Sequence, residues 1–224
     1  MIDLINEKES DVILFTGDMV NQKAEEMKPY INIFSKLKAK DGLYSVLGNH
    51  DYGDYVSWPS PSSKVRNLEQ LMTYQAQMGF KMLNNTQERI EKNGEFTNLL
   101  GVENWGKPPF PQHGDLEKAA SGIEPNEFSI LMSHDPSHWD YQIKQHPKEI
   151  NLTLSGHTHG MQLGIDWLGM KWSPVKYRYR KWAGLYTENN RHLYVNRGLG
   201  FLGWPGRLGI WPEVTLIRLE KIKS

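Results

Sequence analysis

Short apolar runs alternate with polar clusters along this chain, and residues at helical spacing fill the intervals between the runs. Residues 12–16 form one apolar run, and residues 44–47 form the next. Between them, Met27, Ile31 and Phe34 recur at the three-to-four-residue spacing of a helix. A strand, a helix and a second strand in this order predict a right-handed βαβ unit, and therefore a parallel sheet.

The rest of the pattern predicts two further helices and several strands. We expect the helices at residues 1–9 and 65–78. We expect strands at residues 80–83, 88–91, 97–102, 128–132, 152–154, 193–196 and 214–219. A chain of 224 residues is long enough to bury a sizeable core. We therefore predict one α/β domain over residues 1–224.

Four of the predicted strands end directly at clusters rich in His, Asp or Asn. These clusters are Gly17-Asp18, Gly48-Asn49-His50-Asp51, His134, and Gly156-His157-Thr158-His159. Ligands of open α/β sheets bind outside the carboxyl ends of the strands. We therefore expect the four loops to lie at one edge and to converge on one site.

The side chains in these clusters are of the kinds that bind metal ions. Carboxylate, amide and neutral imidazole groups together suit Zn, Mn or Fe better than Ca. Two such ions about 3.5–4 Å apart can clamp a phosphate and activate a water molecule. Taken singly, each cluster has an ordinary explanation, because Gly-Asp after a strand is usually a turn and a single histidine is usually structural. Four clusters in this order favour a metal site.

Composition excludes several other kinds of chemistry. Lys and Arg together number 26, as do Asp and Glu, so net charge gives no electrostatic case for binding nucleic acid. The chain has no cysteine, which excludes disulfides, thiolate metal sites and a cysteine nucleophile. No signal peptide is visible, and no apolar run approaches the ~20 residues of a membrane span. We expect a cytoplasmic location, or membrane association through segments upstream of this chain.

The ordered set of clusters resembles motifs of the calcineurin-like metallophosphoesterase superfamily. Within it, Thr16-Gly17-Asp18, Leu47-Gly48-Asn49-His50-Asp51-Tyr52-Gly53 and Gly156-His157-Thr158-His159-Gly160-Met161-Gln162 are similar to bacterial cell-envelope members. The resemblance implies a four-layer α/β/β/α sandwich. It also implies hydrolysis of a phosphomonoester, phosphodiester or pyrophosphate by metal-activated water, with a phosphorylated small molecule or a lipid-linked molecule as substrate.

The resemblance also assigns metal ligands. Asp18 would bridge two divalent ions, for which Mn, Zn and Fe are the expected metals. Asn49, His134 and His157 would complete the ligand set of the second ion, and His159 would bind the first ion.

Two further residues receive catalytic roles from the same resemblance. His50 would stand near the scissile phosphate, where it would stabilise charge or protonate the leaving oxygen. Asp51 would orient His50 through a hydrogen bond.

The sequence departs from the family pattern in one respect. The family begins with Asp-x-His at the end of its first strand, and this chain contains no Asp-x-His. We therefore expect the first strand to be missing and the chain to be N-terminally truncated. We also expect the first ion to bind weakly or not at all, which leaves one ion, and the chain to be poorly active, unstable or self-associating through an exposed sheet edge. A non-catalytic metal-binding or interaction module remains the alternative function.

Cationic and aromatic residues interleave late in the chain, and two interpretations of them stay open. They are Lys171, Trp172, Lys176, Tyr177, Arg178, Tyr179, Arg180, Lys181 and Trp182. One interpretation is a packed loop with a solvated basic face. The other is a peripheral membrane contact, with aromatic rings at the level of the lipid headgroups.

Overall fold

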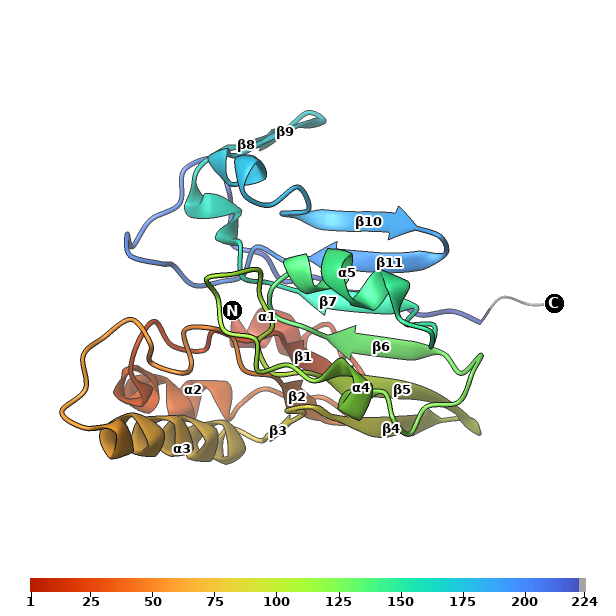
Figure 1. Cartoon of the computed structure of the whole chain (residues 1–224), viewed down its shortest axis with the longest axis horizontal. Helices are drawn as coiled ribbons and strands as arrows, with labels where there is room; N and C mark the ends of the chain where they lie inside the picture. Colours follow the sequence, from red (N-terminus) through yellow and green to blue (C-terminus); the bar gives the residue numbers. More distant parts are fainter. Residues whose placement is uncertain (222–224) are drawn as a thin grey trace.

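The computed structural model describes residues 1–221 and contains two main β-sheets with helices around them (Figure 1). The smaller sheet is parallel, with the order β1 (Ile13–Phe15), β2 (Leu43–Ser45), β3 (Phe80–Met82). The larger sheet has the order β10 (Gly184–Glu188), β11 (Arg191–Val195), β7 (Leu152–Ser155), β6 (Ser129–Met132), β5 (Glu95–Gly101), β4 (Thr86–Lys92). Its four inner strands are parallel, and both edge strands are antiparallel to their neighbours.

Two sets of helices accompany the two sheets. The first set belongs with the smaller sheet and comprises α1 (Ile2–Asn6), the 3₁₀ helix η1 (Ala24–Tyr30), α2 (Ile31–Phe34) and α3 (Pro61–Gln77). The second set belongs with the larger sheet and comprises α4 (Leu116–Ala119), α5 (Ser137–Tyr141) and the 3₁₀ helix η2 (Ile143–Gln145). The chain between β7 and β10 forms η3 (His159–Gln162), the hairpin β8 (Ile165–Trp167) and β9 (Met170–Trp172), and η4 (Pro174–Tyr177).

Alternation of side chains along the strands explains the layered arrangement. In β6, Ile130 and Met132 belong to an apolar cluster between the sheets, which also contains Tyr44 from β2. Leu131, between them in sequence, points to the opposite face and joins a cluster with Trp139 of α5. Both faces of the larger sheet are therefore buried. The result is the four-layer α/β/β/α sandwich that the resemblance implied.

Most of the predicted strands are confirmed, but the strand expected at residues 214–219 is wrong. This segment forms no strand, and Leu216 is 63% exposed. The apolar alternation is present, but no described strand pairs with the segment, and a strand needs a hydrogen-bonded neighbour. The helix expected around Met27 is split between η1, which contains Pro29, and α2. The hairpin β8–β9 was not predicted.

The polar clusters follow strands of both sheets, not of one. Asp18 and Asn49 follow β1 and β2 of the smaller sheet, whereas His134 and His157 follow β6 and β7 of the larger. The site therefore forms where the carboxyl ends of two facing sheets meet. Gly17 permits this close approach, because at its φ of 98° a Cβ atom would lie 2.7 Å from both Gly48 N and His134 Nδ1.

A buried histidine fixes the loop that carries His134. The hydroxyl oxygen of Ser133 lies 2.9 Å from Nδ1 of His138, and Nε2 of His138 lies 3.0 Å from Oε1 of Gln142. The ring also stacks on Trp105 at a centroid distance of 4.7 Å. Burial lowers the pKa of His138 to about 4, so this imidazole is neutral in the folded protein at neutral pH.

We predict that His138 makes the fold acid-sensitive. The unfolded chain takes up the His138 proton near pH 6.5 and the folded chain only near pH 4, so stability falls as pH decreases across this range. The loss is about 3 kcal/mol. For His138→Gln, chemical denaturation of metal-free protein at several pH values should show a stability deficit that shrinks as the pH falls. A deficit that is constant from pH 7 to about 4.5 would contradict this role.

Candidate metal centre

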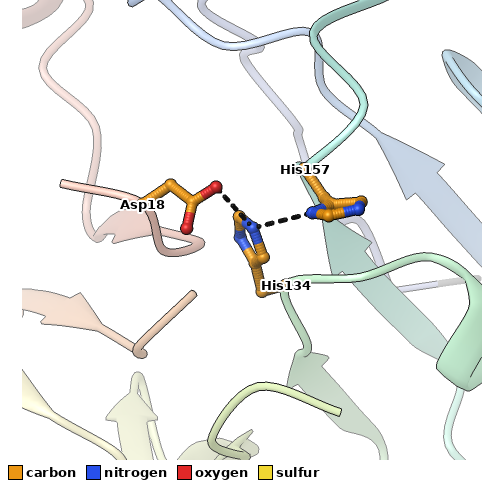
Figure 2. Close-up of side chains that lie close together, drawn as sticks. All are labelled: Asp18, His134 and His157. Carbon is orange, nitrogen blue, oxygen red and sulfur yellow. Dashed lines mark hydrogen bonds and ion pairs between the residues drawn. The ribbon is translucent and has the colours of Figure 1, made fainter. Parts of the chain in front are cut away.

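Three side chains from both sheets meet at the common end of the sandwich. Asp18, His134 and His157 each contribute one ligand atom, and these atoms all lie within 4.8 Å of one another (Figure 2). Asp18 and His157 have left-handed backbone conformations, with φ of 58° and 67°. Such conformations cost free energy for residues other than glycine, and they persist where the surrounding structure requires them.

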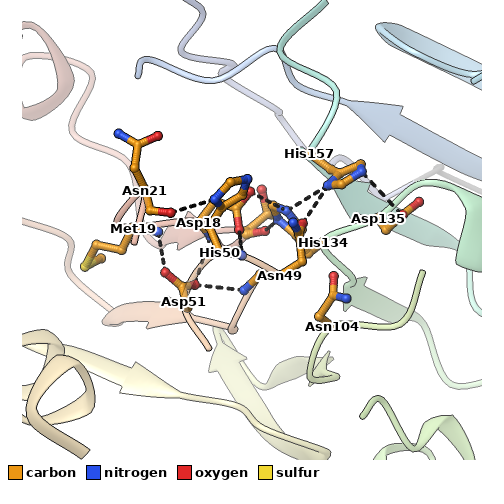
Figure 3. Close-up of polar contacts among 12 residues, drawn as sticks. Asp18, Met19, Asn21, Asn49, His50, Asp51, Asn104, His134, Asp135 and His157 are labelled. Atoms are coloured by element: carbon orange, nitrogen blue, oxygen red, sulfur yellow. Dashed lines mark hydrogen bonds and ion pairs between the residues drawn. The ribbon is translucent and has the colours of Figure 1, made fainter. Parts of the chain in front are cut away.

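The Asp18 loop is shaped by the carboxylate of Asp51. Oδ2 of Asp51 accepts hydrogen bonds from the backbone N–H of Asp18 and of Gly48, at 2.9 and 2.8 Å. Its Oδ1 accepts one from Met19 N at 2.8 Å. One buried carboxylate therefore ties together the loops after β1 and β2 (Figure 3). Burial and the charge of Asp18 raise the pKa of Asp51 to about 7, while the N–H donors act in the opposite direction.

His134 presents a free electron pair to the centre. Its Nδ1 lies 2.6 Å from the carbonyl oxygen of Thr16, which can only accept, so Nδ1 carries the proton. In the neutral ring, Nε2 is then an acceptor. This atom lies 2.9 Å from Oδ2 of Asp18, which is buried and has no hydrogen-bond partner among the described residues.

His157 is held in the complementary tautomer. Its Nε2 lies 2.7 Å from the hydroxyl of Tyr179, and that hydroxyl donates to Oδ2 of Asp135 at 3.2 Å. Because the Tyr179 proton goes to Asp135, the tyrosine oxygen accepts from Nε2–H of His157. Nδ1 of His157 is thereby left with its electron pair directed at the centre, 3.3 Å from Nε2 of His134.

Asn49 supplies a fourth acceptor. Its Nδ2 donates to the hydroxyl of Tyr55 at 2.8 Å, which assigns the amide orientation. The amide oxygen Oδ1 then faces Nδ1 of His157 at 2.8 Å.

The four groups fit a cation, because neutral imidazoles would leave acceptors facing acceptors. Burial alone would lower the pKa of His134, but the Asp18 carboxylate more than offsets this and raises it to about 9. A proton on His134 therefore neutralises Asp18 in the metal-free protein. Asp18, His134, His157 and Asn49 would hold a divalent cation in place of that proton. Burial lowers the pKa of His157 to about 4, which keeps this ring in the neutral form that binds metal.

His159 lies outside the group of three. It is in a left-handed conformation, with φ of 50°, and its Nδ1 is buried without a hydrogen-bond partner in residues 1–221. Burial lowers its pKa to about 4, so the ring is neutral. A buried, unpartnered nitrogen is compatible with the expected role of a ligand to another ion, which remains a prediction.

The structure gives His50 a different orienting partner from the one expected. Nδ1 of His50 lies 2.6 Å from the carbonyl oxygen of Asn21, and its ring packs against Tyr55 at a centroid distance of 4.6 Å. The expected hydrogen bond from Asp51 is not formed among the described residues, because Asp51 is occupied by the backbone amides of the neighbouring loops. The orienting role predicted for Asp51 is therefore corrected to loop support.

Sequence reasoning gave no supporting role to two residues, Asp135 and Tyr179, whereas Tyr55 was a candidate for the lining of the cleft. Asp135 directly follows His134, and an acidic residue beside a candidate ligand is a usable signal. Tyr179 carries no comparable signal, because it reaches the centre from a loop whose path the sequence does not specify. Of the late aromatic group, Tyr179 and Trp182 are buried, whereas Tyr177 is 78% exposed. Part of the segment is therefore packed, and the membrane contact stays a prediction.

Comparison with known sequences identifies the family. The calcineurin-like phosphoesterase profile matches residues 1–161, and the chain therefore belongs to this family of metal-dependent phosphoester hydrolases. It is 32% identical to the uncharacterized metallophosphoesterase YkuE of Bacillus subtilis, over 96% of this chain and 70% of that protein. It is 28% identical to the UDP-2,3-diacylglucosamine pyrophosphatase LpxG of Chlamydia muridarum, over 93% of this chain and 73% of that one.

A further relative is longer than this chain. A transmembrane protein with a metallophosphoesterase domain from Danio rerio is 28% identical over 99% of this chain, and the match spans 48% of its length. Within residues 1–221 of the chain itself, no helix combines the length and the apolar composition that crossing a bilayer requires.

A solved structure supports the fold. The sulfate thiohydrolase SoxB of Thermus thermophilus superposes with a TM-score of 0.50, at 12% identity, over 87% of this chain and 36% of that one.

We predict that the hydroxyl of Tyr179 strengthens metal binding. Tyr179→Phe removes the acceptor for Nε2–H of His157, so the ring loses its fixed tautomer and orientation. The affinity for Zn²⁺ or Mn²⁺ in isothermal titration should fall by about 10–100-fold. Tyr177→Phe is the matched control, because Tyr177 is in the same segment and its side chain is largely exposed. Equal affinities of the two variants would contradict the assigned role.

Proposed function

We propose that this protein hydrolyses a phosphodiester or pyrophosphate bond in a nucleotide or lipid-linked molecule, using one or two bound divalent ions. The observation that carries the proposal is the convergence of four acceptor atoms from Asp18, Asn49, His134 and His157 in a buried space. The substrate class is supported by the printed name of LpxG, a pyrophosphatase of a lipid-bearing nucleotide sugar.

Asp18, Asn49, His134 and His157 would hold the ion. A bound divalent cation supplies Lewis acidity toward the phosphoryl oxygens and lowers the pKa of a bound water. The protein contributes a preset arrangement, since the Asp135–Tyr179 pair and the Thr16 carbonyl fix both imidazole tautomers before a substrate arrives.

We assign to His50 the role of contacting and protonating the oxygen of the leaving group. Its Nδ1–H donates to Asn21, and its Nε2 has no partner among the described residues, so Nε2 is free to meet a substrate oxygen. In its protonated form this nitrogen donates a proton to the leaving group. Its backbone N–H donates to Oδ1 of Asp18 at 2.9 Å, which keeps it beside the centre.

A non-catalytic metal-binding module is the second candidate. It is favoured by the number of candidate metal ligands. The described residues supply four ligands for one ion, but only Asp18 and His159 for a further ion. The two candidates differ in turnover, not in metal binding.

We predict that His50→Gln separates turnover from metal binding. Hydrolysis of bis-p-nitrophenyl phosphate should fall by about 10²–10⁴-fold, because the proton donor is lost, while metal content measured by atomic emission stays at the wild-type value. Asp18→Asn should lose both. His192→Gln is the control, because His192 lies in β11 and contacts Thr187.

Two outcomes would decide against this account. Turnover by His50→Gln equal to that of His192→Gln would remove His50 from the catalytic machinery. Wild-type protein that binds metal without turnover would favour the non-catalytic module.

A further inference from the structure

The hairpin β8–β9 has its apolar face toward solvent. Ile165 pairs with Trp172 and Trp167 pairs with Met170, so these four side chains share one face of the two-stranded ribbon. All four are exposed, between 39% and 67%, and Leu168 in the turn is 77% exposed. A hairpin on a protein surface normally has its apolar face inward and its polar face outward. Here the arrangement is reversed.

The polar face of the hairpin is directed at the protein body. The carboxylate of Asp166 forms an ion pair with the guanidinium of Arg197, and Nζ of Lys171 donates a hydrogen bond to the carbonyl oxygen of Ala183. The Lys171 ammonium also lies 5.3 Å from the ring centroid of the buried Trp182. These contacts fix which face is outward, so the exposed apolar side chains are a consequence of how the hairpin is attached.

A neighbouring loop extends the apolar surface. Gln162 donates through Nε2 to the carbonyl oxygens of Trp204 and Gly206, at 2.7 and 2.6 Å, and Leu163 forms a bridge with Leu208. The loop is therefore fixed at the base of the hairpin. Its exposed apolar residues are Phe201, Leu202, Trp204 and Leu208. Patches of this kind mark interaction surfaces.

The charge of the same region indicates which kind of partner would cover the exposed apolar surface. Residues 167–187 contain five cationic residues and no acidic residue, although the whole chain has a net charge of zero. Lys176, Arg178 and Arg180 are exposed and form no ion pair within residues 1–221. Exposed tryptophan beside unpaired cations is the combination that binds the interface of an anionic bilayer. The hairpin projects from one end of the molecule, which favours insertion over the filling of a groove (Figure 1).

We propose that the apolar face of β8–β9 inserts into an anionic lipid bilayer, with Lys176, Arg178 and Arg180 on the headgroups. This surface goes beyond the proposed hydrolysis and does not depend on it. The hairpin lies in sequence between His159 and Tyr179, both near the metal centre.

Vesicle co-sedimentation tests the surface with the full chain. Wild-type protein should bind phosphatidylcholine vesicles that contain phosphatidylglycerol, and bind weakly to phosphatidylcholine alone. The combined variant Trp167→Ser/Leu168→Ser/Met170→Ser should bind at least about ten-fold more weakly. Its control is Leu4→Ser/Ile33→Ser/Val65→Ser, which removes exposed apolar side chains from α1, α2 and α3.

A second pair of variants tests the charge. Lys176→Gln/Arg178→Gln/Arg180→Gln should weaken binding to the anionic vesicles by about a hundred-fold, given the usual contribution of each cation at such a surface. Lys36→Gln/Lys38→Gln/Lys40→Gln makes the same charge change at exposed positions elsewhere and should have little effect.

The outcomes separate the two proposals. Vesicle binding that is equal for the hairpin variant and its control overturns the docking surface. A concentration-dependent dimer that the hairpin variant abolishes, without vesicle binding by the wild type, also overturns it and assigns the face to a second copy. Vesicle binding by a wild type that does not hydrolyse bis-p-nitrophenyl phosphate supports the docking surface, while the proposed function fails.

Discussion

The whole site depends on one constraint: four hydrogen-bond acceptors meet in a buried space with no donor of their own among them. The tautomers of His134 and His157 are fixed from behind, by Thr16 and by the Asp135–Tyr179 pair, so their free electron pairs face Asp18 and Asn49. Acceptors at such distances repel unless a positive charge lies among them. In the metal-free protein a proton on His134 supplies this positive charge, and a divalent ion held by the four groups would supply it in its place.

The sandwich brings these groups together at a cost in backbone conformation. Two sheets packed face to face place the loops after β1, β2, β6 and β7 at one end, and Asp18 and His157 then adopt left-handed conformations to face the centre. Each such conformation costs of order 1–3 kcal/mol. Asp51 offsets part of this cost by accepting backbone hydrogen bonds from both loops of the smaller sheet.

The sequence predicts the fold and the grouping of the candidate site residues well, because both depend on local patterns; that these residues bind metal stays a prediction. Apolar runs that end at His, Asp or Asn predict the strands, and the same four side chains meet in the structure. Interactions between distant segments are less predictable. The Asp51 carboxylate was expected to orient His50, but it binds the amides of the loop after β1, 32 and 33 residues away. Residues 214–219 alternate like a strand yet have no described partner, and Trp172 and Trp182 look alike in sequence although only Trp182 is buried. Pairing and burial of this kind are set by tertiary contacts.

The central claim is best tested by anomalous diffraction from crystals grown with Mn²⁺ or Zn²⁺. The account predicts one strong peak bonded to Oδ2 of Asp18, Oδ1 of Asn49, Nε2 of His134 and Nδ1 of His157, at about 2.0–2.2 Å for zinc. The lack of a peak at these four atoms, or these four side chains turned toward different parts of the molecule with the metal present, would contradict it.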